Sequence, residues 1–255
     1  MVVWVLAGTK DAVEIINEIA KPDINVLATV TTEYGKELAE VNSKIKVYQG
    51  KMDLVAMLDF VSEHKMDLVI DASHPYAKEA SINAMKACQM ANIKYIRFER
   101  RDISVDTRGV IRAKNFEEAA QIASEIKGNI LLTIGSNNIH YFTEAIPDFK
   151  NRVFARILPT SKMLLKCEEA GLGPGNIIAM KGPFSKQMNI ETLKYCKASV
   201  IVTKESGETG GTVEKLQAAA QLGIQVILID RPDLDYTLKF NDIKEVIDFV
   251  NCNIG

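Results

Sequence analysis

The sequence has few of the residues that build metal sites and disulfide frameworks. Four cysteines and three histidines occur among 255 residues. No two cysteines form a CxxC motif, and neither set has the spacing of a zinc site. The cysteines at positions 88, 167, 196 and 252 are scattered, which favours a reducing compartment. We therefore expect no structural metal and no disulfide scaffold.

Long apolar runs and an excess of positive charge are also missing. No stretch approaches the roughly 18 apolar residues that a membrane span needs, and the first twelve residues lack the basic start and the cleavage site of a signal peptide. The formal net charge is -2 and the pI is about 6.0, whereas nucleic-acid-binding domains usually have a pI above about 9. We expect a cytoplasmic protein that binds neither nucleic acid nor membrane, and that holds any anionic ligand with local basic loops.

Several motifs of well-known enzyme classes are absent. The sequence contains no GxSxG nucleophile elbow, no YxxxK pair of the short-chain dehydrogenases, no GxxxxGK[ST] phosphate loop and no GxGxxG fingerprint. An α/β-hydrolase and a short-chain dehydrogenase are therefore not expected. The composition, 47% hydrophobic and 25% charged, is that of a globular protein of one or two domains.

Short apolar runs alternate with helical patterns along the whole chain. In the first half, we expect strands at 2–7, 25–30, 46–49, 68–72 and 95–98 and helices at 11–20, 35–40, 52–64 and 78–91. In the second half, we expect strands at 130–134, 153–157, 177–180, 200–203 and 226–229 and helices at 116–126, 161–170, 185–194, 212–222 and 243–250. This βαβ order predicts parallel sheets covered by helices.

Two five-strand halves of similar length predict an α/β protein of two Rossmann-like domains. Each domain is expected to be a parallel sheet flanked by helices, with a ligand cleft between the two domains. We place the N-terminal domain at residues 1–98, with nucleotide binding as its expected role, and the C-terminal domain at 99–255, with substrate binding. The join is charged and polar over residues 99–112, and the last helix can pack on either domain.

Ligands of open parallel sheets bind beyond the carboxyl ends of the strands, and the first strand ends in the turn Gly8-Thr9-Lys10-Asp11-Ala12. A glycine lets the backbone turn tightly, and the N–H groups at the start of the next helix can face a phosphate. A single glycine fits an ordinary strand-to-helix turn, capped by Thr9 or Asp11, equally well.

The end of the second strand bears on the choice of dinucleotide. Thr31 and Thr32 lie at its tip, and Glu33 follows. The hydroxyl groups suit a 2′-phosphate, whereas the carboxylate of Glu33 opposes one. The pattern leans towards NADPH over NADH without deciding between them.

Two later turns carry candidate catalytic residues. Ser73 and His74 follow a continuous apolar strand, and a histidine at a strand end can donate a proton or orient a ligand. The alternative is a simple turn in which His74 binds nearby backbone. Lys204 opens a glycine-rich loop after the strand 200–203, where backbone N–H groups and a lysine together can bind an anion. This loop contains Ser206, Gly207, Gly210 and Gly211.

Taken in order, these segments resemble the precorrin-6A reductase and cobalt-precorrin-6A reductase family of corrin biosynthesis. The resemblance rests on Leu6-Ala7-Gly8-Thr9, Asp71–Ala77, Arg97–Arg100, Thr133–Gly135, Ala155–Ile157, Gly182–Ser185, Thr203–Gly207 and Asp230–Pro232. The sequence departs from the family by having Ala7 where many relatives have a second glycine, and by Lys10 inside the turn.

The resemblance implies reduction of one ring double bond of precorrin-6A or its cobalt complex, giving the corresponding precorrin-6B. NADPH or NADH supplies a hydride, and a proton is added at the adjacent carbon. Combining the family with the strand-end positions, we expect His74 and Lys204 to be catalytic. The expected cofactor-binding residues are Gly8, Thr9, Lys10, Asp11, Ala12, Thr31, Thr32 and Ser73. The expected substrate-binding residues are Arg97, Arg100, Arg156, Gly182, Ser185, Ser206, Gly207, Gly210 and Gly211.

Two other functions stay open on sequence alone. A two-domain protein could close on a small anion without chemistry, or a different NAD(P)-dependent α/β reductase could share these turns. The expected partner is the tetrapyrrole substrate, with transient contact to neighbouring enzymes of the pathway.

Overall fold

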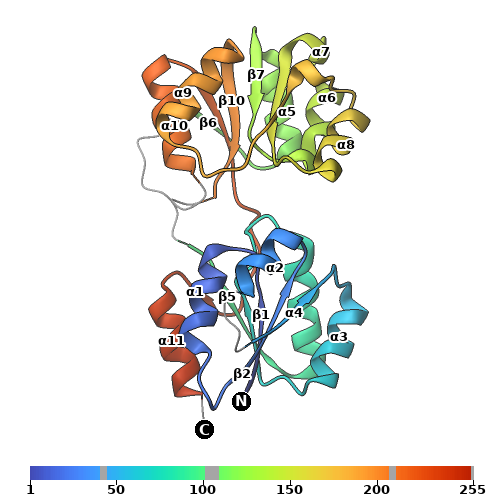
Figure 1. Ribbon diagram of the computed structural model, residues 1–255, viewed down its shortest axis with the longest axis vertical. Helices are drawn as coiled ribbons and strands as arrows, with labels where there is room; N and C mark the ends of the chain where they lie inside the picture. The colour runs from blue at the N-terminus through green and yellow to red at the C-terminus, as the bar shows by residue number, and fades with distance from the viewer. Residues whose placement is uncertain (41–44, 101–108, 207–210, 254–255) are drawn as a thin grey trace. The chain divides into compact units, whose positions relative to one another are not determined.

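The computed structural model describes residues 1–40, 45–100, 109–206 and 211–253. The chain forms two compact units, one of Met1–Arg101 with Asp233–Gly255 and the other of Asp102–Pro232. Each unit contains a six-stranded parallel sheet flanked by helices (Figure 1). The predicted α/β class with two Rossmann-like folds is therefore confirmed.

The sheet of the first unit has its earliest strand near the centre. Its order is β12 (Lys239–Phe240), β5 (Lys94–Phe98), β4 (Leu68–Asp71), β1 (Val2–Leu6), β2 (Asn25–Val30) and β3 (Lys46–Gln49). The chain runs from β1 outward to β2 and β3, and then returns to place β4 on the other side of β1. The change of direction creates a topological switch point between β1 and β4, the place where doubly wound sheets bind ligands.

Helices cover both faces of this sheet because each has one apolar side. The helices of the unit are α1 (Lys10–Ile19), α2 (Glu33–Ala39), α3 (Leu54–Glu63), α4 (Lys78–Ala91) and α11 (Ile243–Cys252). Ile15, Ile16 and Ile19 of α1 are buried on one face together with Val246 and Val250 of α11. Figure 1 shows α1 beside α11 and, on the other side, α3 beside α4.

The sheet of the second unit repeats the same winding. Its order is β6 (Val110–Ala113), β11 (Gln225–Ile229), β10 (Ala198–Lys204), β7 (Asn129–Leu132), β8 (Val153–Ile157) and β9 (Ile177–Ala179). Its helices are α5 (Phe116–Glu125), α6 (Ile139–Ala145), α7 (Phe149–Arg152), α8 (Ser161–Glu169), α9 (Lys186–Tyr195) and α10 (Thr212–Leu222), with 3₁₀ turns η1 (Ser136–Asn138) and η2 (Pro174–Asn176). The switch point lies between β7 and β10.

Two differences from the sequence-based expectation concern the sheet edges. Each sheet has six strands, not five, because β6 and β12 were not expected; they are short edge strands of four and two residues with no clear alternation. The segment Asp233–Gly255 belongs to the first unit, whereas we expected all of 99–255 in the second. Strand β12 pairs with β5, and α11 packs against α1, so both elements complete the first core.

Candidate functional site

The first candidate region is the turn between β1 and α1 at the switch point of the first unit. Gly8 adopts a φ of +118°, a conformation that side chains rarely allow, and open space surrounds the position a Cβ would take. Thr9 caps α1, and its Oγ1 accepts a hydrogen bond from the Ala12 N–H at 3.1 Å. The Thr9 hydroxyl also donates to the Ala72 carbonyl at 2.9 Å, which fixes this turn against the one after β4.

Two predicted ligand-binding residues are paired with each other. Asp11, in the first turn of α1, forms an ion pair with Arg100, which follows β5. Both side chains keep partial exposure, so the pair lies at the rim of the turn and holds the start of α1 to the end of β5. Lys10 is exposed beside it. The structure therefore brings a predicted cofactor residue and a predicted substrate residue together within one unit.

Beyond the second strand, Thr31 is exposed and Thr32 caps α2 by accepting a hydrogen bond from the Gly35 N–H at 3.0 Å. A Cβ at Gly35 would come within 3.1 Å of the Thr32 hydroxyl, so this cap is tightly packed. Both predicted threonines are exposed, and they differ in that Thr32 also has a structural task as the cap of α2.

Asp71, at the end of β4, organises a buried polar network, although no role was expected for this residue from the sequence. It accepts hydrogen bonds from the Ser81 hydroxyl at 2.6 Å and the Tyr95 hydroxyl at 2.7 Å, and from the Ser73 backbone N–H at 3.0 Å. Arg97 forms an ion pair with it at 2.8 Å. Burial and the Asp71 charge raise the pKa of Tyr95, so this phenol stays a donor.

The Asp71 network contains one residue that we had expected to bind substrate. Arg97 has no exposed surface, its Nη1 lies 3.3 Å from the Ser73 hydroxyl, and its guanidinium faces the ring of Tyr236 at 5.5 Å. Its Nε and Nη2 are buried without a hydrogen-bond partner among the described residues. In the structure Arg97 therefore links β4, β5 and the returning C-terminal segment.

His74 lies outside this network. Its side chain is exposed, its Nδ1 accepts a hydrogen bond from the Tyr76 N–H at 3.3 Å, and its ring is tilted against that of Tyr76. This contact matches the simple turn that we kept as an alternative. It leaves the imidazole open to solvent at the carboxyl edge of β4, where it can still meet a ligand.

The second candidate region is the end of β10 in the second unit. Lys204 is half-buried, and burial lowers its pKa to about 8. The hydroxyl of Thr212, in the first turn of α10, donates to the Lys204 carbonyl at 3.2 Å and accepts from the Ser206 N–H at 3.3 Å. Gly211 precedes that turn with a φ of +71°. The predicted residues Gly207 and Gly210 lie outside the described residues.

Arg156, near the end of β8, lies at the same carboxyl edge of this sheet. It is 6% exposed, and burial lowers the pKa of its guanidinium to about 10. Its Nη1 donates to the Asn189 Oδ1 at 2.9 Å, and its guanidinium stacks 3.9 Å from the centre of the Phe184 ring. Together, these contacts fix the cation next to the start of α9.

The turn before α9 contains the remaining predicted residues. Ser185 caps α9 by accepting a hydrogen bond from the Met188 N–H at 3.2 Å, as expected for an N-cap. The Gly182–Pro183 peptide is cis, and a Cβ at Gly182 would come within 3.0 Å of the Phe184 ring. A side chain at Gly182 would therefore push on the ring that stacks against Arg156.

Lys215 of α10 was not among the expected site residues, and it lies beside Thr203 of β10. It is only 9% exposed, and its Nζ donates to the Thr203 hydroxyl at 3.2 Å. Helical spacing could have revealed it, because positions 212, 215 and 219 share one face of a helix. The apolar Ala219 of that face predicts burial for the lysine between them.

Two features are absent from the described part of the chain: a group of metal-binding side chains and a helix that could span a membrane. No group of three or more metal-binding side chains is present there, and all four cysteines are free thiols. Over the same residues, no helix combines the length and apolar character needed to span a bilayer.

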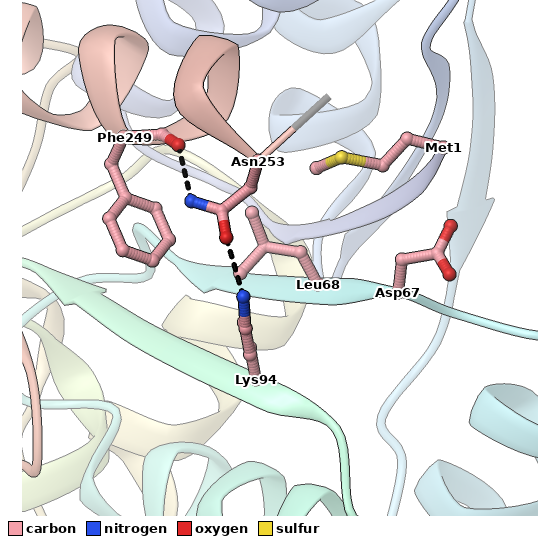
Figure 2. A pocket seen from close by; sticks show the side chains of 6 residues that line it. All are labelled: Met1, Asp67, Leu68, Lys94, Phe249 and Asn253. Atoms are coloured by element: carbon pink, nitrogen blue, oxygen red, sulfur yellow. Dashed lines mark hydrogen bonds between the residues drawn. The ribbon is translucent and has the colours of Figure 1, made fainter. Parts of the chain in front are cut away.

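A pocket of about 340 Å³ lies at the opposite, amino-terminal edge of the first sheet (Figure 2). It is lined by Met1, Asp67, Leu68, Lys94, Phe249 and Asn253. Asp67 precedes β4 and Lys94 opens β5, so the pocket is where these strands begin. Parallel sheets bind ligands where strands end, and we therefore keep this pocket apart from the candidate site.

The chain is similar to one family of known proteins over nearly its whole length. Residues 2–251 match the family model described as Precorrin-6x reductase CbiJ/CobK. A cobalt-precorrin-6A reductase of Methanothermobacter thermautotrophicus is 38% identical over 254 residues, covering 98% of this chain and 83% of its own. A cobalt-precorrin-6A reductase of Priestia megaterium is 38% identical over 247 residues, covering 96% of each chain.

The fold is shared with a solved structure as well. A chain described as CobK precorrin-6A reductase superimposes with a TM-score of 0.79 at 23% identity, covering 99% of this chain and 96% of its own. That likeness confirms the fold, and the sequence matches extend over nearly all of the chain. The protein therefore belongs to the precorrin-6x reductase family and is an oxidoreductase.

Proposed function

We propose that this enzyme reduces one ring double bond of cobalt-precorrin-6A to give cobalt-precorrin-6B, with NADPH or NADH as the electron donor. The family match over residues 2–251 carries the proposal. The cobalt complex is preferred over the metal-free macrocycle because both relatives described above have cobalt-precorrin-6A reductase as their name. The cobalt ion enters as part of the substrate.

The turn after β1 is the proposed dinucleotide site. Gly8 leaves its surroundings open to a ligand, and the N-terminus of the ten-residue helix α1 follows at once. A helix N-terminus attracts phosphate because its N–H groups and its dipole both favour negative charge. These features fit a pyridine dinucleotide, which supplies the hydride when bound. Thr31, Thr32 and Ser73 complete the proposed contacts.

The ends of β8 and β10 are the proposed substrate site. A corrin precursor is fringed by carboxylates, and Arg156 and Lys204, at the ends of their strands, are the proposed partners of these groups. Each charge-assisted hydrogen bond contributes about 1.5–3 kcal/mol. Ser206, Ser185, Gly182 and Gly211 are the proposed neighbours of the macrocycle, as are Gly207 and Gly210 outside the described residues. Arg100 is also a proposed substrate contact. Arg97 is fully buried, which favours a role in supporting the ends of β4 and β5.

The proton that accompanies the hydride needs a donor near neutral pH. Lys204 fits this need because burial lowers its pKa to about 8, so that loss of a proton is easy. His74 is the second proposed donor because it is exposed at the carboxyl edge of the first sheet. We also propose a cytoplasmic location, consistent with four free thiols, and transient contact with neighbouring enzymes of the pathway.

The test is a set of four assays in which the absorbance of NADPH or NADH is followed with cobalt-loaded or metal-free precorrin-6A. We expect oxidation of at least one dinucleotide, fastest with the cobalt complex, together with a product two hydrogen atoms heavier. Faster turnover of the metal-free macrocycle would overturn the substrate assignment. Dinucleotide oxidation without any tetrapyrrole would point to a different reductase.

A further inference from the structure

The carboxylate of Asp71 is saturated with hydrogen bonds. Its Oδ1 accepts the Ser73 backbone N–H at 3.0 Å and the Nη1 of Arg97 at 2.8 Å. Its Oδ2 accepts the hydroxyl of Ser81 at 2.6 Å and that of Tyr95 at 2.7 Å. An ionised carboxylate offers about four lone-pair positions. These four donors therefore fill it and hold it in one orientation.

Support of the fold alone does not explain this number of donors. Arg97 by itself neutralises the charge of Asp71, and both side chains are fully buried. Replacing a buried ion pair by apolar residues of similar volume is often neutral or stabilising in proteins. The hydroxyl groups from α4 and β5 fix the plane of the carboxylate in addition to its charge. A carboxylate fixed in this way sets the position of its remaining donor, the Ser73 N–H in the turn after β4.

A second set of bonds connects the turn after β4 to the turn after β1. Ala72 is held through both of its backbone groups: its N–H donates to the Leu6 carbonyl at 3.1 Å, and its carbonyl accepts the Thr9 hydroxyl at 2.9 Å. The same Thr9 oxygen accepts the Ala12 N–H at 3.1 Å, and the Thr9 carbonyl accepts the Val13 N–H at 3.3 Å. Thr9 therefore connects the turn after β4 to the first turn of α1.

We propose that Asp71 and Tyr95 are positioning residues for the dinucleotide. They fix the turn after β4, and the Thr9 hydroxyl passes that position on to the N-terminus of α1. Both act through Thr9, and neither contacts the ligand. The inference rests on the proposed function for the identity of the ligand, a pyridine dinucleotide with its phosphates at α1. Backbone N–H groups that are held in place beforehand bind phosphate more tightly, because ordering them on binding costs affinity.

The experiment removes one hydroxyl group behind the turn. Tyr95→Phe keeps the ring and removes the bond to Asp71, whereas Asp71→Asn would also destabilise the unit. Tyr95→Phe is made alone and together with Thr9→Ala, which breaks the link between the two turns, and Thr9→Ser keeps that link. Tyr195→Phe, at a position 74% exposed in α9, is the matched control. Dissociation constants for NADPH and NADH are measured by the fluorescence of the reduced nicotinamide, and that for cobalt-precorrin-6A is measured separately.

Tyr95→Phe should bind the preferred dinucleotide about 5-fold more weakly than wild type, because a hydrogen bond to a charged group is lost behind the turn. In the Thr9→Ala background the same change should have an effect below about 2-fold, because the connection is already broken. Thr9→Ser should restore the full effect of Tyr95→Phe. Affinity for the macrocycle should not change, and Tyr195→Phe should behave as wild type. Unchanged dinucleotide affinity in Tyr95→Phe, or an equal loss in both backgrounds, would overturn the inference.

Amide hydrogen exchange of the free enzyme tests the same connection without a ligand. The amides of Ala12 and Val13 are bonded to Thr9 and report on its position. In Tyr95→Phe they should exchange about 5-fold faster than in wild type, whereas the Ile16 amide, deeper in α1, should change less. A general loss of stability would speed all three amides by the same factor, and that result would also overturn the inference. If Ala12 and Val13 respond as expected while neither dinucleotide binds, only the proposed function fails.

Discussion

At the scale of the residue, both units contain charged side chains that are buried but individually compensated. Arg97 pairs with Asp71, and Arg156 bonds to Asn189 and stacks on Phe184. Desolvating such cations is costly, and the specific partners offset the cost. Both arginines therefore fix strand ends in place. Arg97 has no exposed surface and is given this role alone, whereas Arg156 is 6% exposed and is also a proposed substrate contact.

Removing the charge of Asp71 from its buried ion pair with Arg97 should strongly destabilise the first unit. We expect Asp71→Asn to lower the free energy of unfolding of the first unit by roughly 3–5 kcal/mol, because Arg97 loses its counter-charge. Trp4, the only tryptophan, is fully buried in this unit and reports its unfolding in urea through fluorescence.

Asp248→Asn, at an exposed position on α11, is the control for that measurement. Adding Arg97→Met to Asp71→Asn should restore part of the lost stability, since no unpaired charge is left. A urea midpoint for Asp71→Asn equal to that of wild type would show that the pair does not support the fold.

The sequence predicted where functional side chains occur along the chain but not which way they point. Arg97, Arg156 and Lys204 are all at strand ends, as expected. A strand alternates its side chains between two faces, and the short patterns here did not show which face is covered. Tyr95 and Arg97, two residues apart, both turn towards Asp71 for this reason. Lys215 was not predicted because it lies inside helix α10 and not in a turn after a strand.

At the scale of the element, the strands with continuous apolar runs were predicted well. Strands 2–6, 25–30, 68–71, 153–157 and 225–229 lie within one residue of expectation at each end, because buried parallel strands have the clearest pattern. The edge strands β6 and β12 depend on pairing with distant residues, which a local pattern cannot reveal. The same holds for α11, whose apolar side suits either unit.

Helix α11 should support the first unit. Val246→Asp places an unpaired carboxylate in the core between α11 and the sheet, and we expect a loss of roughly 3–5 kcal/mol in the free energy of unfolding. The urea transition of Trp4 is the measurement, with Lys244→Asp at an exposed position of the same helix as control. If the Trp4 transition stayed at the wild-type midpoint, α11 would not be part of this core.

At the scale of the whole molecule, the two units have the same kind of doubly wound sheet. Each six-stranded sheet reverses its winding at one point, β1/β4 in the first and β7/β10 in the second. The described ligand residues that we predicted follow the carboxyl ends of strands, and those after β1, β4 and β10 lie at these points. The proposed division of labour follows: the first unit holds the dinucleotide beside Gly8, and the second holds the acidic macrocycle beside Arg156 and Lys204.

Amide hydrogen exchange with each ligand added separately tests that division most directly. With NADPH or NADH, the account predicts slower exchange at residues 8–12 and 72–77. With cobalt-precorrin-6A, it predicts slower exchange at residues 181–186 and 204–206. Protection by the macrocycle confined to the first unit, or protection by either ligand at the amino-terminal pocket around Asp67 and Lys94, would contradict the account.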